Sequence, residues 1–281
     1  MEIGIWTGFY NDLEIEDAVR HLVEVGWSQI EFSAEHVARV TAKDWKNRLK
    51  ALSEVCQSLG VKAWQLHSPL ELNIASFDQD KQHKEVEAAL QWIEYCQVLN
   101  VPYMVIHPGG SQGYRSLKEK QKILQLNVDS FNKIGKFAED LGVKLAIENM
   151  LAGEKSGGRR FPGEHIAELY EIINAVGSSS IGICFDTSHA NALNIDLVEA
   201  IYECGSLLCA THISDNDGSG DQHRLPYNGK IDWVEVIQAL KAVDYQNLFD
   251  LEIPGETIPP TFVRDLKLEY ARKMLTQLLN K

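Results

Sequence analysis

The chain has 281 residues, of which 44% are hydrophobic and 24% charged, as in an ordinary folded globular protein. Its formal net charge of −13 argues against a general binding surface for nucleic acid or anionic membranes. The sequence has neither an apolar run of about 18 residues nor a basic leader before an apolar stretch, so we expect a cytoplasmic protein without a membrane span.

In chain order, an apolar run at 2–6 predicts the first strand. A unit then recurs about every 40 residues, in which an amphipathic helical segment ends at Gly or Asn and an apolar run follows. Gly and Asn tolerate the left-handed conformation that closes a helix, so each marks a helix stop before a strand. The stops are Gly26, Gly60, Asn100 and Gly142, and the strands that follow them are 29–32, 63–67, 103–107 and 145–148.

Apolar stripes with helical period lie in 45–59, 86–96 and 124–141. Further strands are expected at 180–186, 207–213 and 248–253, and further helices near 162–176, 193–203, 231–242 and 261–280. The strands are continuous apolar runs, which is typical of a parallel sheet buried on both faces. Eight alternating units predict an α/β protein with one (β/α)₈ TIM-barrel domain over residues 1–281. An open doubly wound sheet is disfavoured, because the sequence has no glycine-rich phosphate turn.

The five cysteines are odd in number, and no two have the spacing of a metal or redox pair. All of them fall inside apolar segments, so they predict buried free thiols in a reducing compartment. They are Cys56, Cys96, Cys184, Cys204 and Cys209.

Ionisable side chains stand at or beside the last residue of seven expected strands. They are Glu31, His67, His107, Glu148, Asp186, His212 and Glu252. A closed barrel brings the carboxyl ends of its strands into one ring, where active sites of this fold lie. Four buried acids in that ring would repel one another and be driven protonated unless a cation were present. The pattern therefore predicts a divalent metal site of mixed carboxylate and imidazole ligands, suited to Mn²⁺, Zn²⁺, Co²⁺ or Mg²⁺.

Five segments resemble, in the same order, those of the xylose isomerase-like TIM-barrel superfamily. That superfamily includes sugar-phosphate isomerases and epimerases and the endonuclease IV, or AP endonuclease 2, family. The segments are VIHPG at 105–109, IEN at 147–149, FDTSH at 185–189, the stretch 212–233, and LE at 251–252. Each segment alone is a weak signal, but their joint occurrence covers essentially the whole chain.

The resemblance implies a shared metal quartet of Glu148, Asp186, His212 and Glu252, with Glu148 and Glu252 as the catalytic acid and base. The implied reaction is isomerisation or epimerisation of a sugar or sugar phosphate. It would proceed by proton transfer at the carbon next to a carbonyl, through a metal-stabilised enediolate. The expected binding partner is then a small carbohydrate, and no binding to nucleic acid or membranes is expected. A homodimer is also expected, because dimers are common in this superfamily.

The same resemblance keeps an endonuclease IV-like activity at abasic DNA sites open. His67 and His107 fall where that family places ligands of one extra metal, and His189, Asp221 and His223 where it places those of another. Against it stand the acidic composition, a run after Asn149 that is not glycine-rich, and a loop between His212 and Asp221 that looks shorter.

Two features leave the function undecided. The loop after His212 leaves the substrate open, and the metal site is compatible with more than one class of reaction. Ketose epimerases of the superfamily carry an Arg where Gly218 stands, which puts a free-ketose substrate in doubt. A dehydratase or lyase on the same metal site is a further candidate. A protein that only stores metal is disfavoured, because storage does not need two opposed glutamates beside an open mouth.

Four cations are candidates for binding an anionic substrate. Lys155, Arg159 and Arg160 lie in a glycine-containing segment, 154–163, that could form a lid, and Arg224 follows His223. The competing interpretation of this segment is an ordinary solvated loop.

Overall fold

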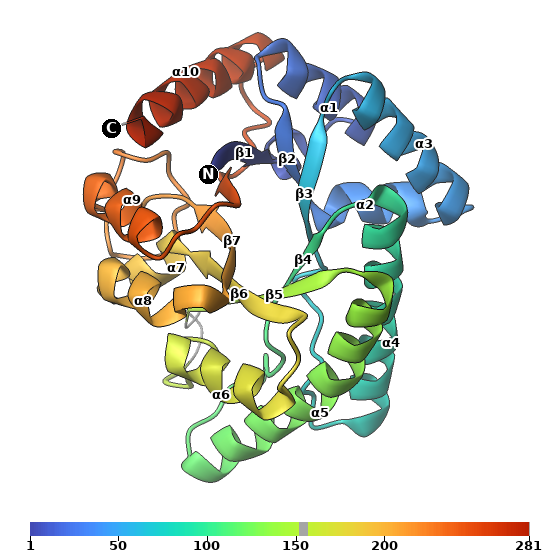
Figure 1. Cartoon of the computed structure of the whole chain (residues 1–281), viewed down its shortest axis with the longest axis vertical. Helices are drawn as coiled ribbons and strands as arrows, with labels where there is room; N and C mark the ends of the chain where they lie inside the picture. Colours follow the sequence, from blue (N-terminus) through green and yellow to red (C-terminus); the bar gives the residue numbers. More distant parts are fainter. Residues whose placement is uncertain (152–156, 281) are drawn as a thin grey trace.

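The computed structural model describes residues 1–151 and 157–280. Eight parallel strands close into a barrel in sequence order, each paired with the next and β8 paired with β1 (Figure 1). The strands are β1 (Glu2–Trp6), β2 (Gln29–Phe32), β3 (Lys62–His67), β4 (Tyr103–Ile106), β5 (Lys144–Glu148), β6 (Ile181–Asp186), β7 (Leu208–Ile213) and β8 (Leu248–Leu251). The predicted (β/α)₈ barrel is confirmed.

Helices surround the strands as an outer ring (Figure 1). They are α1 (Ile15–Glu24), α2 (Ala34–Thr41), α3 (Trp45–Ser58), α4 (Gln79–Leu99), α5 (Leu117–Leu141), α6 (Ile166–Val176), α7 (Thr187–Ala192), α8 (Leu197–Cys204), α9 (Trp233–Ala242) and α10 (Thr261–Leu279), with short 3₁₀ turns η1 (Thr7–Tyr10) and η2 (Gly205–Leu207). None of the described helices is both long enough and apolar enough to cross a membrane.

The helix stops expected from the sequence have the expected backbone. All four have positive φ, for example 58° at Asn100 after α4 and 69° at Gly142 after α5. At the other end of α5, the Ser116 side chain accepts a hydrogen bond from the backbone N–H of Glu119. Local capping therefore sets where these helices begin and end, and so where the following strands can start.

The helix expected near 193–203 is α8, and an additional short helix that the sequence did not predict, α7, precedes it. Asp186 ends β6, and its side chain accepts a hydrogen bond from the backbone N–H of His189 at 2.7 Å. This cap starts α7 directly at the strand end, and α8 follows after a short break. The strand β8 also ends at Leu251, two residues earlier than expected, which leaves Glu252 just beyond it.

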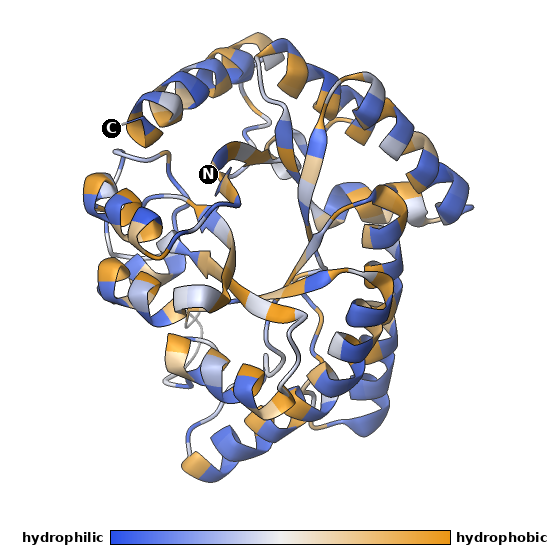
Figure 2. Ribbon diagram, viewed as in Figure 1, coloured by the Kyte–Doolittle hydropathy of each residue, from blue (hydrophilic) through white to orange (hydrophobic). Residues whose placement is uncertain are grey.

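Hydrophobic residues run along the strands and over the helix faces beside them, and hydrophilic residues cover the outer helix surfaces (Figure 2). A smaller apolar cluster of Val105, Ala146, Cys184, Cys209 and Ala210 comes from β4 to β7. All five cysteines are buried and free, as expected. The apolar packing supports a rigid rim on which the polar side chains of the strand ends are held.

Candidate metal centre

Four acidic and imidazole side chains converge from the ends of neighbouring strands. Glu148 and Asp186 are the last residues of β5 and β6, His212 is the penultimate residue of β7, and Glu252 follows β8. One ligand atom from each lies within 4.8 Å of the others. The side chain that links them is His212, whose Nδ1 lies 3.2 Å from Glu148 Oε1 and 3.2 Å from Glu252 Oε2.

The donor atoms of this quartet suit a divalent cation. Asp186 and His212 are fully buried. Asp186 Oδ2 and Glu252 Oε2 are buried atoms without a hydrogen-bond partner among the described residues. A buried carboxylate oxygen without a donor is costly, and three carboxylates with one imidazole form a common ligand set for Mn²⁺, Zn²⁺ or Mg²⁺. The residues present therefore fit the metal that the sequence led us to expect.

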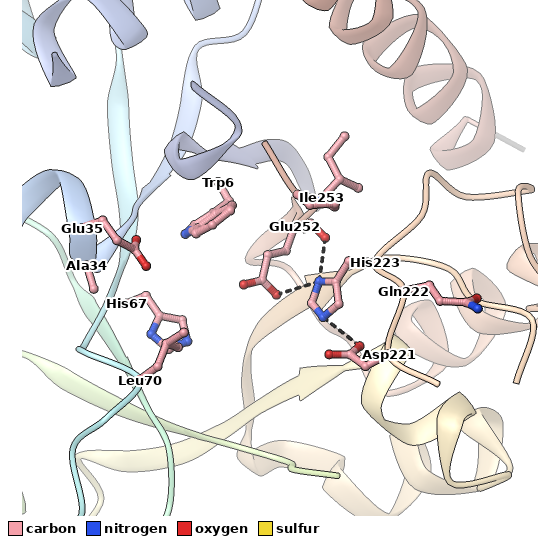
Figure 3. Close-up of a pocket in the computed structure, with 11 residues that line it drawn as sticks. Trp6, Ala34, Glu35, His67, Leu70, Asp221, Gln222, His223, Glu252 and Ile253 are labelled. Carbon is pink, nitrogen blue, oxygen red and sulfur yellow. Dashed lines mark hydrogen bonds and ion pairs between the residues drawn. The ribbon is translucent and has the colours of Figure 1, made fainter. Parts of the chain in front are cut away.

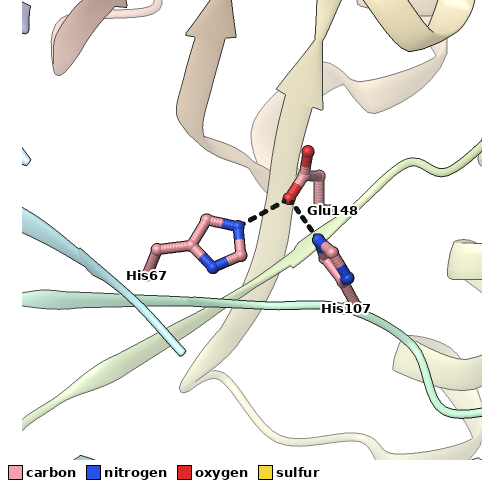
Figure 4. A group of neighbouring side chains, drawn as sticks. All are labelled: His67, His107 and Glu148. Atoms are coloured by element: carbon pink, nitrogen blue, oxygen red, sulfur yellow. Dashed lines mark hydrogen bonds and ion pairs between the residues drawn. The ribbon is translucent and has the colours of Figure 1, made fainter. Parts of the chain in front are cut away.

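A second cluster lies on the β3 and β4 side of the quartet (Figure 4). His67 ends β3 and His107 directly follows β4. The Nε2 atom of each ring lies 3.2 Å from Glu148 Oε2. Glu148 thus presents one carboxylate oxygen to His212 and the other to this histidine pair.

A third cluster lies on the other side, around Asp186. Its ligand atoms come from Asp186, His189 and His223. Asp221 lies beside it, with Oδ1 2.9 Å from His223 Nε2 and Oδ2 3.5 Å from His189 Nε2. The structure thus brings together all nine residues that the sequence singled out as metal ligands.

Burial and neighbouring charges compete within the site. Burial raises the pKa of Asp186 to about 6, although the imidazoles of His189 and His223 oppose the shift. Burial also disfavours the ionised form of Glu148, but His212 and the other imidazoles around it hold its pKa well below the usual range. Without a cation, the site depends on protonated imidazoles to balance its carboxylates.

This dependence predicts how the metal-free protein responds to pH. Burial lowers the pKa of His67, but Glu148 more than offsets it and raises the pKa to about 9; Glu252 and Asp221 likewise overcome burial at His223 and raise its pKa to about 10. These protonated imidazoles stabilise the fold fully below about pH 6.5, the ordinary histidine pKa, and lose that effect as pH rises through 9 and 10.

We therefore expect the melting temperature of the chelator-treated protein to fall between about pH 7 and pH 10. The metal-loaded protein is the control, because coordinated imidazoles carry no titrating proton. A metal-free protein that melts in parallel with the loaded one across this range would contradict the expectation.

Two further buried acids group with His212: Glu31, which the sequence placed among the strand-end acids but not in the metal quartet, and Asp250, which the sequence analysis did not single out. Glu31 Oε2 lies 3.0 Å from His212 Nε2 and accepts a hydrogen bond of 2.7 Å from Gln65 Nε2. Asp250 is fully buried beside them, and burial with the nearby Glu31 raises its pKa well above the usual range. The sequence did contain a signal for Asp250. Side chains two residues apart on a strand point to the same side, so this spacing predicts Asp250 on the same side as Glu252.

Glu31 is placed to orient the metal-facing ring of His212. A carboxylate that accepts the far N–H of a ligating imidazole fixes its tautomer, and its loss typically costs about 10–100-fold in metal affinity. We expect Glu31→Gln to weaken divalent-metal binding by that amount in a competition titration with a chelating dye. Glu54→Gln, exposed on α3, is the matched control and should bind as wild type.

The four cations named as substrate-binding candidates are placed as follows. Lys155 lies outside the described residues. Arg160 Nε donates to Glu164 Oε2 at 2.9 Å, and Arg224 donates to Asp217 Oδ2 at 3.0 Å. Arg159 makes a long contact of 3.4 Å with the carbonyl of Gly113. Arg160 and Arg224 therefore have acidic partners within the chain.

A cavity of about 360 Å³ is lined by Glu252 of the quartet, by His67 of the second cluster and by His223 of the third. Figure 3 shows Glu252, His223 and Asp221 on one side of it and His67, Trp6 and Glu35 on the other. The ligand clusters therefore face a space large enough for a small molecule.

The family model described as xylose isomerase-like TIM barrel matches residues 19–276. Among curated proteins, an uncharacterised protein of Methanocaldococcus jannaschii is 30% identical over 190 residues, or 66% of this chain and 63% of that protein. The inosose isomerase of Bacillus subtilis is 26% identical over 195 residues, or 66% of this chain and 67% of the relative. The apurinic-apyrimidinic endonuclease 1 of Plasmodium falciparum is 28% identical over 212 residues, or 68% of this chain and 33% of the relative.

Solved structures share the fold over nearly the full length. A D-tagatose 3-epimerase-like protein superposes with a TM-score of 0.82 at 23% identity, covering 100% of this chain and 97% of that one. The IolI protein, in a crystal structure with a zinc atom, superposes with a TM-score of 0.80 at 19% identity, covering 99% and 98%. At these identities the superpositions establish the common barrel.

Proposed function

Because the chain belongs to the family of xylose isomerase-like TIM barrels, we propose that it is a divalent-metal-dependent enzyme that isomerises or epimerises a sugar. The observation that carries this proposal is the convergence of two glutamates on one point. The Glu148 and Glu252 carboxylates both lie 3.2 Å from His212 Nδ1, and Glu252 lines the cavity. The name of the inosose isomerase relative, which covers about two thirds of both chains, supports the same reaction class.

In this proposal Glu148, Asp186, His212 and Glu252 hold the cation, which supplies Lewis-acid polarisation of the substrate carbonyl when bound. Glu148 removes the proton from the carbon next to the carbonyl, and Glu252 returns a proton from the other side. Return to the opposite face of the same carbon gives an epimer, and return to the neighbouring carbon gives the aldose–ketose isomer. In the same proposal His189, which is buried beside Glu148, donates a hydrogen bond to a substrate oxygen.

A second candidate is metal-dependent cleavage of phosphodiesters at abasic DNA sites. One specific observation favours it. The two clusters beside the quartet bring the number of potential metal ligands to nine. These residues would hold up to three cations, which would supply an activated water and neutralisation of the phosphodiester's negative charge. The net charge of −13 disfavours it, because DNA binding rests on Lys and Arg that neutralise phosphates.

The test measures metal content and activity on the same purified samples. We expect deuterium from solvent to enter the α-carbon of at least one α-hydroxyketone in a panel of free and phosphorylated sugars. We also expect no incision of duplex DNA that carries an abasic site. Three metals per chain, abasic-site incision and no deuterium uptake would replace the isomerase with the endonuclease.

A further inference from the structure

One wall of the cavity carries a hydrogen-bond donor and an acceptor that have no partners among the described residues. Trp6 ends β1, and Glu35 lies in the first turn of α2. Trp6 Nε1 and Glu35 Oε2 are both buried atoms that lack a hydrogen bond within this part of the chain. Both residues line the cavity, and Figure 3 shows the nitrogen-bearing edge of Trp6 turned toward Glu35 across a gap.

Both groups are held by the fold. A Cβ placed on Gly8 would lie 2.2 Å from the indole of Trp6, so the ring packs directly against the backbone of η1. The backbone that carries Glu35 is fixed by the helix cap at Ser33, whose side chain accepts from the N–H of His36. An indole N–H and a carboxylate that are desolvated without partners cost free energy, which a ligand that bonds to both recovers.

A hydroxyl group is the ligand that complements this pair. It accepts one hydrogen bond and donates another, so a single hydroxyl can accept from Trp6 Nε1 and donate to Glu35. A phosphate ester has only acceptors at neutral pH and would face the Glu35 carboxylate. The described residues that line the cavity include no Lys or Arg, whereas Glu35, Asp221 and Glu252 are acidic.

We propose that Trp6 and Glu35 form a recognition subsite for a hydroxyl at the end of the substrate remote from the carbonyl. This inference rests on the proposed isomerase function and narrows its substrate to neutral, polyhydroxylated molecules without a terminal phosphate. The Trp6 N–H favours a substrate that offers a hydroxyl oxygen as acceptor. The Glu35 carboxylate favours the same hydroxyl by accepting its hydrogen bond, and it disfavours phosphorylated substrates by repelling their negative charge.

The first test removes the donor alone. Trp6→Phe keeps an aromatic ring but lacks the N–H, and we expect KM for the best unphosphorylated ketohexose to rise roughly tenfold, with a smaller change in kcat. Trp64→Phe is the matched control, because the Trp64 N–H already donates to Gln29 at 2.6 Å, away from the cavity. An unchanged KM in Trp6→Phe would overturn the proposal.

The second test does not need turnover. The indole N–H signal of Trp6 is assigned among the six tryptophans by its absence from Trp6→Phe. We expect this signal to shift when unphosphorylated ketohexoses are added and to stay in place with the same sugars carrying a terminal phosphate. A shift only with the phosphates would overturn the proposal, as would turnover of the sugars with no shift of this signal.

The third test removes the charge. Glu35→Gln keeps an acceptor oxygen, and we expect it to reduce the preference for free sugar over sugar phosphate at least about tenfold, with Glu54→Gln as control. Equal preference in wild type and variant would remove Glu35 from the subsite. If no sugar exchanges its α-proton but the Trp6 signal still responds to free sugars, the isomerase reaction fails and the hydroxyl subsite stands.

Discussion

The Glu148→Gln protein should lose exchange of the substrate's α-proton with solvent by at least about 10²–10⁴-fold, while most of its metal remains bound. The amide keeps an oxygen that can coordinate and removes the carboxylate that accepts the proton. Solvent-deuterium incorporation measured beside metal content separates the two roles. Glu252→Gln should behave similarly and leave exchange on one face of the substrate.

Glu168→Gln provides the control for a generic effect of replacing a buried acid. Glu168 is buried, pairs with Lys120 at 2.8 Å and accepts a hydrogen bond from Tyr114, away from the ligand clusters. It should retain exchange per folded molecule. Full recovery of exchange when Glu148→Gln is saturated with metal would show that Glu148 only holds the cation.

Replacing Asp186 by Ala should weaken metal binding by roughly 10²–10³-fold. Four-ligand zinc sites contribute about 10–16 kcal/mol, so one ligand accounts for about a quarter of that. The same change removes the cap of α7, which costs about 0.5–2 kcal/mol in the metal-free protein. Asp186→Ser keeps an oxygen for the cap but removes the whole carboxyl group, so it should lose metal affinity while retaining more of the stability.

Chelator competition gives the metal affinity, and urea unfolding of the metal-free proteins gives the stability. Asp196→Ala is the matched control, because Asp196 caps α8 through the N–H groups of Val198 and Glu199 on an exposed face. It should lose stability and keep its metal affinity. An Asp186→Ser protein that binds metal like wild type would reduce Asp186 to a helix cap.

The sequence carried enough local information to predict the barrel and the quartet. Asn100 and Gly142 stop helices by their own backbone preference, whatever packs around them. Once strands and helices alternate eight times, closure brings every carboxyl end of a strand to one mouth. Glu148 and Asp186 are the last residues of their strands, and this position in the sequence was therefore enough to place both at the mouth of the barrel.

Tertiary structure alone decided which side chains meet across the barrel. Glu31 from β2 reaches His212 on β7, and Trp6 from β1 faces Glu35 from α2 (Figure 3). These pairings depend on the stagger of the strands and on side-chain rotamers set by packing, neither of which leaves a periodic mark in the sequence. The sequence by itself thus determined that carboxylates and imidazoles gather at this mouth, and closure of the barrel determined which other buried groups contact them and face the cavity.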